Sequence, residues 1–109
     1  MCIRDRSTGL YQVGHFAQMQ NAANDTVALQ IYATSDNGSN WDLVVQSNFA
    51  NGSAVGNGTS YKHTLVNVTD ISNVKIKHVA TSIDSGSEIN AATDFNFTGF
   101  FFTRIGDSQ

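Results

Sequence analysis

Residues 26–45 read TVALQIYATSDNGSNWDLVV, and their pattern of apolar residues decides the fold. Every second residue of 27–33 is apolar, and after a polar interruption the same alternation returns at Trp41, Leu43 and Val45. A repeat of two residues is the period of a β-strand with one buried face, whereas a helix would repeat every 3.6 residues. The stretch therefore predicts two strands joined by a turn, with Trp41 on the apolar face of the first strand.

The rest of the chain shows the same period of two. In GLYQVGHFAQMQ, residues 9–20, the odd positions form an apolar face that also carries His15. Segments rich in Gly, Asn, Asp and Ser separate the strands, because these residues tolerate left-handed backbone or cap it locally. Further strands are expected at 61–68, 73–83 and 94–105, with turn-rich segments at 51–60 and 84–94. The pattern predicts an all-β chain of about six strands without a helix, folded as an antiparallel β-sandwich.

The first six residues, MCIRDR, are interpreted as foreign to the protein. They match the translation of a transposon-end adaptor used to prepare sequencing libraries, so residues 1–6 are treated as a processing scar. On this interpretation the chain comes from an assembled environmental sequence, and we expect the intact protein to be longer at its N-terminus. Residues 7–109 have the length of one domain or part of one, and we expect a single domain there.

Composition narrows the class of protein. Four basic and eight acidic residues follow Arg6, which gives a net charge of −4 for that part of the chain. A nucleic-acid binder needs clustered Lys and Arg, so we expect no nucleic-acid partner. Charged residues make up 14% of the chain, against about 25% in typical soluble domains. A polar but uncharged surface is typical of extracellular or virion β-proteins, and no apolar run has the length needed for membrane insertion.

The turn within the first stretch, Thr34 to Trp41, fits the signature Ser/Thr-x-Asp-x-Gly-x-x-Trp and so resembles the Asp-box of sialidases and other β-rich proteins. Gly38 can supply the positive φ of a tight turn, and the Asp36 carboxylate can accept hydrogen bonds from the turn's own amides. A sialidase also needs several arginines and a much longer propeller, but Arg104 is the only arginine after residue 6. We therefore interpret Asp36, Gly38 and Trp41 as a structural turn.

No constellation of residues typical of catalysis occurs in the sequence. The only cysteine, Cys2, lies within the suspected scar, so neither a disulfide nor a thiolate metal site is expected. His15, His63 and His78 are not spaced as ligand pairs, and a structural histidine is the favoured interpretation of His15 and His78 on their apolar faces. Oxygens around Asp36 lack the spacing of the helix-loop-helix calcium site, although calcium binding stays open. We expect no enzyme activity, no cofactor and no metal site.

Three segments carry a resemblance to a known superfamily. Residues 9–16, GLYQVGHF, resemble the Gly-x-Tyr strand, and residues 95–102, FNFTGFFF, resemble the closing Phe-Ser/Thr-Gly-Phe strand, of the jelly-roll superfamily of complement-type globular heads and tumour-necrosis-factor-like ligands. Residues 65–79 are similar to the family's turn into a strand, with Thr69-Asp70 in place of the usual Gly-Asp. The ending FFFTRIGDSQ resembles C-terminal adhesion domains of tail-fibre and capsid-associated proteins of marine bacteriophages. The resemblance implies a jelly roll that lacks its first strands, forms a compact trimer, binds a partner and catalyses nothing.

Three functional hypotheses follow from these observations. The favoured one is a non-enzymatic attachment domain at the tip of a virion fibre or similar structure, which binds a cell-surface glycan or protein. The loops at 21–26, 51–60 and 84–94 would form its contact surface, because a sandwich presents its loops at its ends. The second is an accessory carbohydrate-binding or structural module of a secreted hydrolase, and the third is the head domain of a cellular complement-like protein. The favoured hypothesis places the protein on a virion or outside the cell.

The strand expected at 94–105 gives a candidate oligomer interface. Its second half is aromatic on both faces, with Phe101 on one face and Phe100 and Phe102 on the other. A sandwich of two sheets buries one face of each strand, so another surface must cover the remaining rings. By analogy with the resembling family, we expect Phe100 and Phe102 to lie at the three-fold interface of a homotrimer. Missing N-terminal strands or a loop could cover them instead.

Overall fold

The computed structural model describes residues 2–3, 7–90 and 98–109. These residues form β-strands connected by turns, and within these ranges no helix occurs that could cross a membrane. The strands are β1 (Cys2–Ile3), β2 (Gly9–Asn21), β3 (Thr26–Thr34), β4 (Asp42–Ala50), β5 (Gly56–Val68), β6 (Lys75–Thr81), β7 (Glu88–Ile89) and β8 (Gly99–Gly106). The all-β class predicted from the period of two is confirmed.

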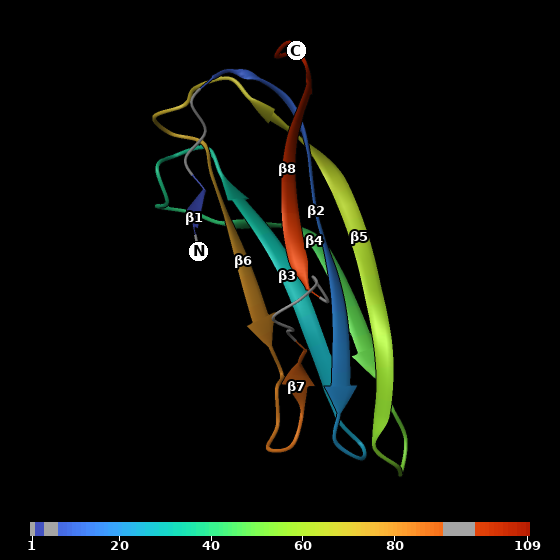
Figure 1. Ribbon diagram of the computed structural model, residues 1–109. Helices are drawn as coiled ribbons and strands as arrows, with labels where there is room; N and C mark the ends of the chain where they lie inside the picture. The colour runs from blue at the N-terminus through green and yellow to red at the C-terminus, as the bar shows by residue number, and fades with distance from the viewer. Residues whose placement is uncertain (1, 4–6, 91–97) are drawn as a thin grey trace.

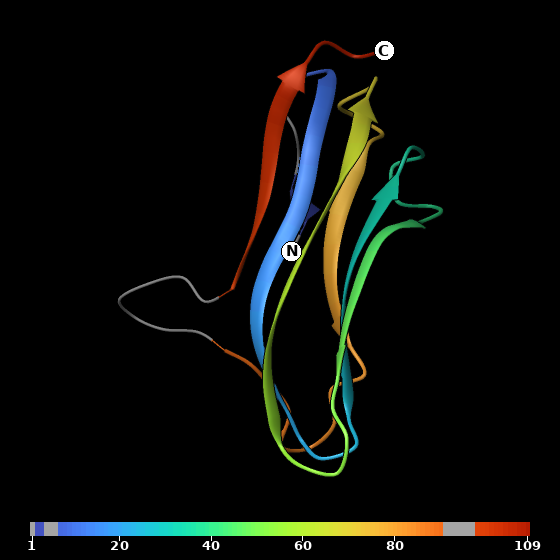
Figure 2. The same ribbon diagram turned by 90° about the vertical axis from the view of Figure 1, so that its right-hand side faces the viewer.

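Two antiparallel sheets form the layers of a sandwich (Figures 1 and 2). One sheet has the strand order β1-β6-β3-β4. The other has the order β5-β2-β7, and β8 also pairs with β2. β2 is therefore the central strand of its sheet, with β5 along one edge and β7 and β8 in succession along the other.

The pairing of β2 with β5 fixes which residues face the core. It runs over 13 residue pairs, from Gly9 opposite Val68 to Asn21 opposite Gly56, without a shift in register. Because side chains alternate along a strand, the odd positions of β2 all lie on one face, and this face is buried against the second sheet. The main core cluster contains Tyr11, Val13, Ile31, Val45, Val66, Val68, Val74 and Ile76, and a smaller one contains Ala17, Met19 and Val27.

A β-bulge in the pairing of β3 with β4 changes two predicted positions. The register shifts between Ile31 and Tyr32, and Tyr32 then lies opposite Leu43. Leu43 is 47% exposed. The Lys77 Nζ atom lies 4.3 Å from the Trp41 ring centre and 5.2 Å from that of Tyr32, so the rings of Trp41 and Tyr32 contact the same ammonium group. The prediction that Trp41 and Leu43 continue the buried face is therefore wrong. A shift of one residue moves the following side chains to the other face of the sheet.

Some element boundaries also differ from the sequence-based expectation. β5 begins at Gly56, so half of the segment expected as a loop at 51–60 belongs to a strand. Of the strand expected at 94–105, residues 94–97 lie outside the described residues, and β8 begins at Gly99. Cys2 and Ile3, from the segment interpreted as a scar, pair with Lys77 and Ile76 at the edge of β6.

Candidate functional site: an uncharged aromatic sheet face

The side of the β5–β2–β8 sheet that faces away from the second sheet is the candidate functional site, here called the outer aromatic face. Even-numbered residues of β2 lie on it, because the odd-numbered ones are buried in the core. The register places three rows of residues across it: Leu65–Gln12–Thr103, His63–Gly14–Phe101 and Tyr61–Phe16–Gly99. None of these nine residues is Asp, Glu, Lys or Arg. The face is therefore a neutral surface with aromatic rings from all three strands.

Two glycines allow the rings to lie flat against the sheet. A Cβ atom at Gly14 would lie 2.5 Å from Cζ of Phe101, and one at Gly99 would lie 2.7 Å from Cζ of Phe16. Each phenylalanine thus covers a glycine of the neighbouring strand, a close approach that any larger residue would prevent. The sequence analysis missed this arrangement, although a glycine inside an apolar strand is a signal of it.

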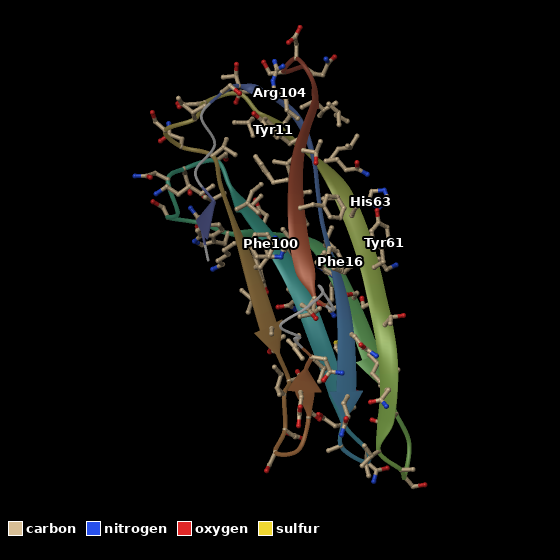
Figure 3. The ribbon with its side chains drawn as sticks, in the orientation of Figure 1. Tyr11, Phe16, Tyr61, His63, Phe100 and Arg104 are labelled. Atoms are coloured by element: carbon tan, nitrogen blue, oxygen red, sulfur yellow. The ribbon has the colours of Figure 1, made fainter. Side chains whose placement is uncertain are left out.

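The rings of β5 and β8 contact one another on the outer aromatic face. Tyr61 and Phe101 are stacked, with ring centres 6.0 Å apart and planes inclined by 20°, and Tyr61 lies 5.5 Å from His63. Figure 3 shows Phe16 on β2 beside Tyr61 and His63 on β5. Tyr61 is 58% exposed and Leu65 is 54% exposed. Apolar and aromatic side chains gathered without charges are the composition found at the centre of protein–protein interfaces.

Phe100 and Phe102 lie on the opposite side of β8, toward the core. Phe102 pairs with Val13 and stacks on Tyr11, with ring centres 4.4 Å apart, and it packs against the main core cluster. Phe100 is 37% exposed, and its ring lies 4.4 Å from that of His78. The prediction that Phe100 and Phe102 lie on the outside of the sheet is therefore wrong. Both rings lie on its inner face, and Phe101 is the ring of this segment that faces outward.

The turn between β3 and β4 is held by its own side chains. The Asp36 Oδ1 atom accepts hydrogen bonds from the Thr34 hydroxyl (2.6 Å) and the Asn40 amide (2.9 Å). These hydrogen bonds, first that of Thr34, lower the pKa of Asp36 to about 2. Gly38 has φ of 97°, and the Trp41 ring covers it. With its carboxylate engaged in this way, Asp36 serves the conformation of the turn.

The loops that follow β2, precede β5 and precede β7 lie together at one end of the sandwich (Figure 1). The backbone amide of Asn24 donates a hydrogen bond to the Gly52 carbonyl (2.6 Å), and the backbone amide of Asn51 donates one to the Asp25 backbone carbonyl (3.2 Å). The carboxylate of Asp25, which is 5% exposed, accepts a hydrogen bond from the Ser87 hydroxyl. The loops expected to form a contact surface are thus joined by hydrogen bonds in their described parts. This end is a second, polar candidate surface.

The acidic and imidazole side chains of the described residues are spread over several parts of the fold. Residues 2–3, 7–90 and 98–109 contain no group of three or more His, Cys, Asp or Glu side chains placed to share a metal ion. Asp36 and Asp25 are both engaged by neighbouring hydroxyl and amide groups. His63 lies on the outer aromatic face, whereas His15 and His78 lie between the sheets.

The fold defines the class of the chain: an all-β protein built as a sandwich of two antiparallel sheets. Comparison of the sequence and structure with models of protein families, with curated proteins and with solved structures finds no match.

Proposed function

We propose that this domain is a non-enzymatic attachment module of a virion fibre or similar extracellular structure, and that it works as a homotrimer which binds a cell-surface glycan or protein. The observation that carries the proposal is the outer aromatic face, an uncharged surface whose exposed rings need a partner. The resemblance of residues 9–16 and 95–102 to the jelly-roll superfamily supports a three-fold assembly by analogy.

Burial of the exposed side chains on the outer aromatic face would favour association. Complete burial of an aromatic or leucine side chain contributes roughly 1.5–3 kcal/mol. Tyr61 and Leu65 are each more than half exposed, so covering both would contribute about 2 kcal/mol per subunit, with further gains from Phe16 and Phe101. The same surface would favour aggregation if it were left exposed.

The mass of the protein by light scattering tests the oligomeric state. We expect three times the chain mass of 11.8 kDa, and we expect the double variant Tyr61→Ser, Leu65→Ser to be a soluble monomer. The matched control replaces Leu43 and Val55 by Ser, because these residues are 47% and 62% exposed but lie away from the face. A monomeric wild-type protein, or a trimer that survives the Tyr61 and Leu65 changes, would contradict the assignment.

The binding partner is tested on a glycan array and on intact host cells. We expect binding that depends on the polar loop end, and a charge introduced there by Ala23→Lys or Ser53→Glu should weaken it at least tenfold while the trimer persists. These residues are exposed, so the fold should tolerate both changes. Absence of binding to any glycan or cell surface would reject the attachment function even if the trimer is found.

A further inference from the structure

Two histidines from opposite sheets lie beside each other inside the sandwich. His15 of β2 is 3% exposed. The ring centre of His78, on β6, lies 6.3 Å from that of His15, and the planes of the two rings are inclined by 75°. Within its own sheet, His15 pairs with Phe100 of β8, and His78 pairs with Ile31 of β3. The two imidazoles therefore lie where the inner faces of the two sheets meet, next to apolar residues.

The described surroundings of the two imidazoles contain no group that would stabilise a positive charge. A cavity of about 270 Å³, partly open to solvent, lies beside both rings, and its described lining residues include no Asp, Glu, Lys or Arg. From β4 the contact to His15 comes from the neutral hydroxyl of Ser47. Lys77, which precedes His78 in β6, points to the other face of its sheet, where its Nζ atom lies 4.3 Å from the Trp41 ring centre. An imidazolium ion would therefore have no carboxylate partner among the described residues.

The hydrogen bonds of His15 also favour its neutral form. Its Nε2 atom lies 2.6 Å from the Ser47 hydroxyl oxygen. Its Nδ1 atom is buried and has no hydrogen-bond partner among the described residues. A neutral ring with its proton on Nε2 donates to Ser47 and leaves only a lone pair unused at Nδ1. A second proton would place an unpaired N–H donor and a positive charge in the core, and both are costly there.

We propose that the pair of His15 and His78 makes the sandwich acid-sensitive, so that the packing of the two sheets against each other weakens as the pH falls from 7 toward 5. Two protonated imidazoles in this apolar space would repel each other across the boundary between the sheets. The unfolded chain takes up the same two protons without this cost. Acid therefore favours states in which the sheets have separated.

The pKa values of the two rings give the pH range of this effect. Burial lowers the pKa of His15, and burial, the neighbouring His15 and the amino-terminal charge lower that of His78 to about 4. The stability that depends on neutral rings is therefore complete above the ordinary value of 6.5 and is lost as the pH falls through the folded values. The carboxyl groups of Asp25 and Asp36 have a pKa lowered from 3.8, so they titrate below this range.

Urea denaturation of the full chain at pH 7.0 and 5.0, at one protein concentration, tests the proposal. The unfolding constant of the wild-type protein should rise at least about 20-fold, the factor that follows for His78 alone from pKa values of 6.5 unfolded and about 4 folded. His78→Gln should reduce the rise by about this factor.

The matched control is Val79→Gln, which introduces the same side chain at the next residue of β6. Val79 pairs with Gln30 and points to the other face of the sheet, so both imidazoles remain. This variant should show the full wild-type rise between pH 7.0 and 5.0. Equal rises in the wild-type protein and His78→Gln, or a reduced rise in Val79→Gln, would overturn the proposal.

An NMR titration of the wild-type protein keeps the test independent of any effect of a substitution on folding. The ring ¹³C and ¹⁵N shifts of His15 and His78 should remain those of neutral imidazole at pH 5.5 while the protein is folded. A midpoint near 6.5 for either ring would reject the proposal. The titration requires neither a trimer nor a ligand, so its result is separate from the tests of the proposed attachment function.

Discussion

Gly14→Ala offers the sharpest test of the outer aromatic face. Gly14 is the centre of the row His63–Gly14–Phe101. A Cβ atom there would lie 2.5 Å from Phe101 Cζ, 2.6 Å from the Lys62 carbonyl oxygen and 2.8 Å from His63 Cβ. A phenylalanine ring can turn away, but a carbonyl of the paired strand cannot move without disturbing the register. The contact with the Phe101 ring can therefore relax, whereas the contacts with the Lys62 carbonyl oxygen and His63 Cβ resist relaxation.

The magnitude follows from these contacts. Overpacking a well-packed region typically costs 1–3 kcal/mol, and we expect Gly14→Ala to fall near 2 kcal/mol. In a domain of this size, each kcal/mol lowers the melting temperature by roughly 4–8 °C. In the Phe101→Ala variant the conflict with the ring is absent, and the conflict with the backbone remains. About half of the destabilisation caused by Gly14→Ala should therefore persist in the double variant.

Urea denaturation of the four proteins, the wild type, the two single variants and the double variant, measures this coupling. The control is Gly52→Ala, because a Cβ atom at Gly52 would meet nothing within 4 Å, and its stability should change by less than about 0.5 kcal/mol. If Gly14→Ala and Gly52→Ala have the same effect, Phe101 does not lie over Gly14 as described. The oligomeric state should be measured in parallel, since the stability of an oligomer depends on protein concentration.

Three further predictions concern the core and the turn. Phe102→Ala should lower the free energy of unfolding by about 2–4 kcal/mol and Phe100→Ala by about 1 kcal/mol or less, since only Phe102 packs against the main core cluster; equal losses in urea denaturation would contradict the inward position of Phe102. Gly38→Val should cost about 1–3 kcal/mol because φ at this position is 97°, and unchanged thermal stability would argue against the turn. The pKa of Asp36 in the folded protein, about 2, lies below its pKa in the unfolded chain. The charged carboxylate therefore stabilises the fold fully at a pH above the unfolded pKa, and this stabilisation is lost as the pH falls through about 2. A ¹³C titration of the Asp36 carboxyl group with a midpoint near 4 would contradict this.

Sequence periodicity was sufficient for the fold class because it reports which residues a strand can bury. The odd positions of β2 are buried as predicted, from Tyr11 to Met19. The pattern could not decide the faces of β8, where three phenylalanines in succession make either face apolar. Only the pairing of Phe102 with Val13, on a strand almost ninety residues earlier, identifies the inner face. The bulge after Ile31 was equally invisible, because no glycine or proline marks it.

The candidate sites depended still more on long-range pairing. The turn residues Asp36 and Gly38 could be recognised because their contacts are local. The outer aromatic face combines β2, β5 and β8, and a single sequence does not say which distant strands lie side by side. For the same reason the sequence did not indicate that His15 and His78 lie close together, because they approach each other only once the two sheets are stacked.

The central position of β2 has a consequence for biosynthesis. β5 can pair with β2 as soon as it leaves the ribosome, but β8 follows about thirty residues later and occupies the other edge. Until then that edge of β2 offers unpaired backbone groups to any passing chain, and Tyr11 lacks the ring of Phe102 that later stacks on it. Nascent chains on neighbouring ribosomes would be the nearest partners during this interval. A chaperone that shields exposed strand edges should therefore raise the yield of this domain more than a slower rate of translation would.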